Sequence, residues 1–161
     1  MNELSIEVVN LTRLALEPGE VALLVAGVLS DEGVSGAELG VRFVGARRMR
    51  GLNRDFRGHD EVTDVLSFPL EDDDDEKEPA AGPHAQAEPP RLLGDVVVCP
   101  VRAAAQARGA GVPLAHEIAA LLVHGTLHVL GYDHETDAGE MATRQDELLG
   151  ASNWERLLAQ D

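Results

Sequence analysis

The most constraining feature of this chain is the stretch 124–134, which reads H-G-T-L-H-V-L-G-Y-D-H. It closes the apolar run A-H-E-I-A-A-L-L-V, which contains no Pro or Gly and has the composition of a helix. His124 and His128 are four residues apart, so on a helix their rings lie on one face and can point at a common position. Gly131 can adopt the left-handed conformation that ends a helix, and the turn returns His134 toward the same position. The stretch therefore predicts a long helix with a three-histidine metal site at its end.

Three neutral imidazoles leave one position of a tetrahedral zinc ion open, which is typical of catalytic rather than structural zinc. The spacing matches that of zinc proteases with the pattern H-E-x-x-H-x-x-G-x-x-H, in which the Glu is the general base. Gly125 occupies that position here, so a metalloprotease would lack the carboxylate that its chemistry needs. Imidazole ligands also suit other metals. We expect one Zn²⁺ per chain, with other divalent metals such as Ni²⁺ as alternatives.

Two further stretches accompany the histidine motif: N-R-D-F-R-G-H-D-E-V-T-D-V-L-S-F-P at 53–69 and L-L-G-D-V-V-V-C at 92–99. With the three motifs in this order, the sequence from about residue 36 to residue 150 resembles the YbeY family of bacterial endoribonucleases, the rRNA maturation factors. The resemblance implies a single-strand-acting, metal-dependent endoribonuclease in small-subunit rRNA 3′-end processing and ribosome quality control. It also implies that single-stranded rRNA and the small ribosomal subunit with its proteins are the partners. A non-enzymatic ribosome-assembly factor with a structural metal is the alternative, and a zinc metalloprotease is a weaker one.

Arg57 and Asp133 are the candidate catalytic residues. A phosphodiester in hydrolysis needs a cation near the oxygens on which charge grows, and the resemblance assigns this role to Arg57. Asp133 precedes the third histidine and could accept a proton or orient a histidine from behind. The role of general base stays open between Asp133 and four further side chains, namely Glu135, Asp64, Asp95 and His59, and a metal-bound hydroxide acting alone is a further alternative.

The net charge of −16 argues against a nucleic-acid partner, but the charge is unevenly distributed. Residues 71–90 carry eight acidic residues and one Lys, a local charge of −7, and no aliphatic side chain larger than Ala, so we expect a disordered loop. Residues 42–57 carry six Arg and one Asp, a local charge of +5. Arg binds phosphate through two parallel hydrogen bonds. The segment therefore predicts an RNA-binding surface formed by Arg42, Arg47, Arg48, Arg50 and Arg54.

The remaining pattern predicts a single α+β domain over residues 1–161, with helices covering a small mixed sheet of about four strands. Cys99 is the only cysteine, which excludes an internal disulfide and suits a reducing compartment. No apolar run has the length of a membrane span, so we expect a cytoplasmic protein. We also expect a monomer. Strands are expected at 4–9, 38–44, 62–69 and 92–98, and helices at 20–30, 46–56, 100–110, over about 19 residues from Pro113, and at 138–150.

Overall fold

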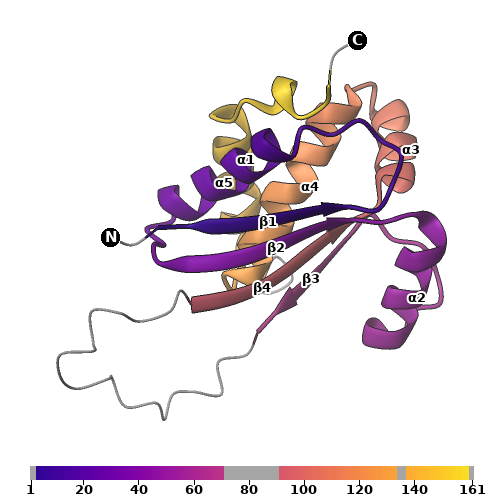
Figure 1. Ribbon diagram of the computed structural model, residues 1–161, viewed down its shortest axis with the longest axis horizontal. Coiled ribbons are helices and arrows are strands. Elements are labelled where there is room, and N and C mark those ends of the chain that lie inside the picture. The colour runs from indigo at the N-terminus through magenta and orange to yellow at the C-terminus, as the bar shows by residue number, and fades with distance from the viewer. Residues whose placement is uncertain (1–2, 71–90, 134–136, 160–161) are drawn as a thin grey trace.

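The computed structural model describes residues 3–70, 91–133 and 137–159 (Figure 1). The acidic stretch 71–90 lies outside the described residues. Each expected strand and helix is present, and most have shifted ends. The elements in chain order are β1 (Ser5–Asn10), α1 (Pro18–Asp31), β2 (Ala37–Phe43), α2 (Ala46–Arg57), β3 (Val65–Pro69), β4 (Arg91–Val98), α3 (Pro100–Ala110), α4 (Leu114–Val129), α5 (Glu140–Gly150) and the 3₁₀ turn η2 (Trp154–Arg156).

The four strands form one mixed sheet in the order β1-β2-β4-β3. β2 runs parallel to both β1 and β4, whereas β3 runs antiparallel to β4 and forms one edge of the sheet. The β2–β4 register shifts so that Leu92 and Gly94 oppose consecutive residues, which leaves Leu93 as a bulge. Gly94 has φ 139°, and a Cβ there would collide with the carbonyl oxygen of Phe68. This position therefore requires glycine.

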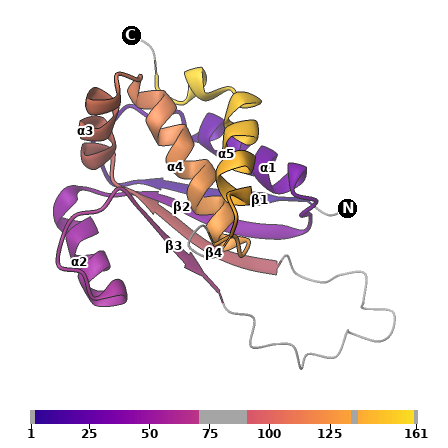
Figure 2. The ribbon, with the colours of Figure 1, turned by 180° about the vertical axis from the view of Figure 1, so that it is seen from behind.

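The helices divide between the two faces of the sheet (Figures 1 and 2). α1, α4 and α5 lie on one face, and α2 lies on the other. The V-V-V run of β4 serves both faces because successive strand residues point in opposite directions: Val96 and Val98 belong to the large core under α1 and α4, and Val97 belongs to the smaller core under α2. The predicted α+β class with a mixed sheet is confirmed.

α4 is the central helix, and its side chains at Ile118, Leu122 and Leu127 are fully buried. It has 16 residues, shorter than expected, because Pro113 is its N-cap and the chain leaves the helix after Val129. In the part of the chain that the structure describes, no single helix is long and apolar enough to cross a membrane. α3 and α4 reach that length only as a pair, bent by 116°.

Candidate functional site

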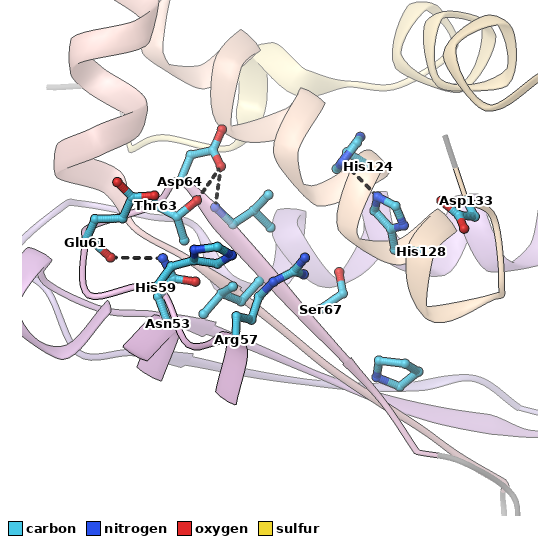
Figure 3. A pocket seen from close by; sticks show the side chains of 13 residues that line it. Asn53, Arg57, His59, Glu61, Thr63, Asp64, Ser67, His124, His128 and Asp133 are labelled. Atoms are coloured by element: carbon cyan, nitrogen blue, oxygen red, sulfur yellow. Dashed lines mark hydrogen bonds between the residues drawn. The ribbon is translucent and has the colours of Figure 1, made fainter. Parts of the chain in front are cut away.

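A cleft of ≈ 600 Å³ opens where the end of α4 faces the connection between α2 and β3 (Figure 3). The edge strand β3 lines it between two walls. The wall from α4 and the turn after it, here called the histidine wall, consists of His124, His128 and Asp133. The opposite wall, here called the arginine wall, consists of Arg57, His59, Glu61, Thr63 and Asp64.

His124 and His128 lie one turn apart on α4, as the spacing predicts, and their rings meet edge to face with centroids 4.5 Å apart. Their Nε2 atoms are 3.0 Å from each other and half-buried in the cleft (Figure 3). Each ring is held from behind by its other nitrogen: His124 Nδ1 lies 2.9 Å from Oε1 of Gln145, and His128 Nδ1 lies 2.9 Å from the carbonyl oxygen of Tyr132.

These contacts define what the two rings offer to the cleft. A carbonyl oxygen only accepts hydrogen bonds, so each Nδ1 carries the proton and donates it. In the neutral imidazoles of His124 and His128 the Nε2 atoms then both present lone pairs, directed at one another over 3.0 Å. Two converging lone pairs are the arrangement that a cation stabilises, and Nδ1 donation to a carbonyl is the usual support of a metal-bound histidine. The histidine pair therefore fits a metal ion.

The turn after α4 directs the chain back toward the cleft. The N–H of Tyr132 donates to the carbonyl of Leu127 and that of Gly131 to the carbonyl of His128, each over 3.0 Å, which is a Schellman motif. Gly131 has φ 103°, so the predicted left-handed turn is confirmed. The returning chain places Asp133 in the cleft.

The third predicted ligand, His134, and the candidate base Glu135 lie outside the described residues. Across residues 3–70, 91–133 and 137–159, no group of three or more His, Cys, Asp or Glu side chains converges in the manner of a complete metal site. The described chain thus contains two of the three predicted ligands.

Gly125 has a packing role that the sequence did not reveal. A Cβ at this position would lie 2.6 Å from Cγ1 of Val96 and 3.2 Å from Cγ2 of Val65. Ser67 on β3 also donates its hydroxyl to the Gly125 carbonyl over 2.9 Å. The helix thus crosses the sheet where only glycine fits, and the glutamate of the zinc proteases has no space at this position.

Arg57 ends α2 and lines the cleft. The connection after it is held by the buried Asn53, which donates its side-chain amide to the carbonyl of Glu61 over 3.0 Å and accepts the N–H of His59 at its own carbonyl over 3.3 Å. Figure 3 shows Arg57 and His59 extending from this connection toward the histidines. One buried amide therefore shapes the arginine wall.

The candidates for a general base separate by position. Asp133, Asp64 and His59 line the cleft, whereas Asp95 is exposed on the opposite face of the sheet, next to Gly40. One oxygen of Asp64 accepts the N–H of Val65 over 2.7 Å. Asp95 is thus removed from the candidates.

Carboxylates also meet behind the arginine wall. Burial, followed by the nearby charge of Asp64, raises the pKa of Glu117 above its ordinary value, and His116 partly opposes this. Within the described ranges, the dominant charged neighbour of Glu117 is thus another acid.

The other five arginines are exposed and lie outside the lining of the cleft. Arg50 forms an ion pair with Asp60 over 2.8 Å, and Arg54 forms one with Asp55 over 3.1 Å. The Asp60 contact raises the pKa of Arg50, while Arg50 holds the pKa of Asp60 below its usual range. Sequence counting overlooked Asp60, so the +5 segment is partly neutralised by its neighbour. Of the six arginines at 42–57, those for which the described residues provide no ion pair are Arg42, Arg47, Arg48 and Arg57.

Comparisons with known proteins show the family of this chain. The family described as "Endoribonuclease YbeY" matches residues 15–153. The chain is 46% identical over 123 residues to an endoribonuclease YbeY of Bacillus cytotoxicus, with 74% of this chain and 76% of that protein covered. It is 40% identical over 149 residues to that of Mycobacterium ulcerans, with 91% and 82% covered.

A solved structure shares the fold of this chain. The solution structure of TM1509 from Thermotoga maritima superposes with a TM-score of 0.57 at 25% identity and covers 89% of this chain and 86% of that one. Since the family match spans most of the sequence and the relatives align over most of their own length, the chain belongs to the endoribonuclease YbeY family.

Proposed function

We propose that this protein is a metal-dependent endoribonuclease that cleaves single-stranded rRNA in the cleft between the histidine wall and the arginine wall. The observation that carries the proposal is the convergence of the His124 and His128 Nε2 atoms in the cleft that Arg57 also lines. Zn²⁺ is the proposed metal, with His134 as its third ligand, because three imidazoles and an open position are typical of catalytic zinc. Ni²⁺ is the alternative, since imidazole suits it as well.

A bound divalent cation supplies a lowered water pKa and a polarised phosphoryl oxygen. The chain supplies the remaining functions. Arg57 lies on the other wall and is proposed to bind the scissile phosphate through its planar guanidinium. Asp133 is proposed to accept a proton, because it lies in the cleft beside the histidines. Asp64 and His59 are the competing proton acceptors.

Recognition of the RNA is proposed to rely on its backbone. Arg42, Arg47 and Arg48 are exposed, and no ion pair occupies them within the described ranges. Such cations bind phosphate with little base preference and with strong salt dependence. Arg50 and Arg54 are proposed as weaker contributors, because each must first leave its carboxylate partner.

The proposed cellular role is maturation of the small-subunit rRNA at its 3′ end and ribosome quality control, by a cytoplasmic monomer that meets the small ribosomal subunit. Family membership supports this role. The competing proposal is a non-enzymatic assembly factor with a structural metal. A site with three histidine ligands argues against it, because structural zinc normally has four protein ligands.

The deciding experiment is cleavage of an end-labelled single-stranded rRNA fragment by the purified protein with zinc, with a chelator, and as Arg57→Ala. We expect cutting only with metal, and a loss on the order of 10²-fold or more for Arg57→Ala because a cation facing transition-state charge is removed. Arg108→Ala, on the exposed surface of α3, is the matched control and should cut as the wild type does. Absence of cutting by the zinc-loaded protein, with tight subunit binding retained, would favour the assembly factor.

A further inference from the structure

α5 packs against α4, and Figure 2 shows the two helices side by side. Its residue Gln145 is half-buried and places Oε1 2.9 Å from Nδ1 of His124. The contact joins residues 21 positions apart in sequence, so it exists only because α5 folds back along α4. An amide oxygen only accepts hydrogen bonds, so this contact favours the tautomer of His124 that carries its proton on Nδ1.

The neighbouring residue on α5, Arg144, is connected to His128 by a chain of hydrogen bonds through Glu32 and Tyr132. Its Nε donates to one carboxylate oxygen of Glu32, at the end of α1, and the other oxygen of Glu32 accepts the Tyr132 hydroxyl over 2.7 Å. Arg144 also donates to the carbonyl of Asp31 over 3.2 Å. The Glu32 side chain is 12% exposed, so the two bonds that it accepts are largely shielded from water.

Tyr132 is the residue of this hydrogen-bond chain that contacts His128. Its hydroxyl is held by Glu32, its N–H donates to Leu127, and its carbonyl oxygen accepts from Nδ1 of His128 over 2.9 Å. Burial raises the pKa of Glu32, but the hydrogen bonds from Arg144 and Tyr132 outweigh it and hold the pKa below its ordinary value. Glu32 therefore stays ionised and keeps Tyr132 in place.

We propose that α5 is a positioning platform for the metal site, in which Gln145 orients His124 directly and Arg144 orients His128 through Glu32 and Tyr132. This inference rests on the proposed histidine metal site. Neither Gln145 nor Arg144 touches the substrate, and both act by keeping the two Nε2 lone pairs directed at one position. Groups in such supporting positions typically change metal affinity about 10- to 100-fold when removed.

The two paths can be tested separately. Gln145→Leu removes the acceptor of His124 only, and Tyr132→Phe removes the Glu32 bond that holds the acceptor of His128. Gln145→Glu keeps an acceptor oxygen at the same place and should preserve the function. Asp146→Leu is the matched control, because it puts the same leucine on the exposed surface of the same helix.

The first readout is the tautomer of each histidine in the metal-free protein, measured by long-range ¹H–¹⁵N correlation spectra above the ordinary imidazole pKa of about 6.5. We expect wild type, Gln145→Glu and Asp146→Leu to hold both rings as the Nδ1–H form. Gln145→Leu should disturb His124 alone, and Tyr132→Phe should disturb His128 alone. Unchanged tautomers in Gln145→Leu, with a melting temperature equal to that of Asp146→Leu, would overturn the proposal.

The second readout is zinc affinity by competition with a chromophoric chelator. We expect Gln145→Leu to bind zinc about 10- to 100-fold more weakly than wild type, and Gln145→Glu to bind at least as tightly as wild type. Equal weakening in the two Gln145 variants would reduce the residue to a packing role and overturn the proposal. Failure of the wild type to bind zinc would instead contradict the proposed function, and the metal-free tautomers would still test the platform.

Discussion

The two walls of the cleft are built in different ways. On the histidine wall, both rings are half-buried, lie on a helix anchored by buried leucines, and are held from behind by hydrogen bonds of 2.9 Å. On the arginine wall, Arg57 and His59 are exposed, and the support comes from the backbone of their connection, held by Asn53. Catalytic groups must be held at defined positions, whereas a flexible RNA strand can be bound by side chains that change conformation. We therefore expect the histidine wall to hold the metal, and the arginine wall to place the scissile phosphate and, through Arg57, to offset the charge that grows on it.

The largest expected effect is a loss of RNA cleavage without a loss of RNA affinity. His128→Ala removes one lone pair from the metal position without touching the arginines, so cleavage should fall to the rate of the metal-free protein while RNA affinity stays close to wild type. Single-turnover cleavage and filter binding measure the two quantities. If the folded variant still cleaved RNA, the proposal that His128 holds the catalytic metal would be contradicted.

A second substitution tests how the histidine wall is seated on the sheet. Gly125→Ala forces a methyl against Val96, and we expect a net loss of about 1–2 kcal/mol in the free energy of unfolding, since overpacking costs more than alanine adds to the helix. Gly27→Ala in α1 is the control: nothing lies within 4 Å of its added Cβ, so it should gain up to about 1 kcal/mol. Urea denaturation measures both, and equal changes would refute the close helix–sheet crossing.

The support behind the histidine wall has a pH signature. The folded-state pKa of Glu32 is lowered from 4.5, so its contribution to stability is present above that value and is lost as the pH falls through the lowered pKa. Glu32→Gln should therefore cost about 2 kcal/mol at pH 7, the size of charged hydrogen bonds, and the difference from wild type should shrink in acid. Urea denaturation of the wild type and of Glu32→Gln, at pH 7 and at a pH below 4.5, measures this difference in stability. A difference that is the same at the two pH values would contradict the prediction.

The smallest effect concerns the arginine-rich surface of α2. Arg48→Ala removes an exposed cation for which the described chain provides no ion pair, and should weaken RNA binding several-fold and lower the salt slope by about 0.7, the value of one phosphate contact on a single strand. Arg50→Ala should change both less, because Asp60 already engages Arg50. Binding at several salt concentrations tests this order. A reversed order would show that the ion pair opens on contact with RNA.

Local features of the fold were predictable because they depend on local chemistry. Glycine and proline punctuate the helices, and apolar periodicity defines the strands, so the element order followed from the sequence. The closeness of His124, His128 and Asp133 also followed, since a helix spacing and one glycine turn determine it. Arg57 could be assigned only by resemblance, and the structure then places it on the opposite wall of the same cleft.

Contacts that join distant elements were not predictable. The Tyr132–Glu32 bond spans 100 residues and depends on α1, α4 and α5 packing together. Asp95 appeared suited to the cleft, yet Val96 and Val98 face α4, so alternation turns Asp95 to the other face. His116 is half-buried against Trp154, with ring centroids 5.0 Å apart. In each case the position of the side chain depends on which helix or strand packs against it, and the local sequence does not determine that packing.

The most direct measurement is zinc X-ray absorption spectroscopy on the purified, zinc-loaded protein and on His134→Ala. Three imidazole nitrogens and one light atom that the protein does not supply, at about 2.0 Å, are the expected shell of an open catalytic site. The His134→Ala spectrum should then show two imidazoles. A shell of four protein ligands, or an unchanged spectrum in His134→Ala, would contradict the three-histidine centre on which the nuclease assignment of this cleft rests.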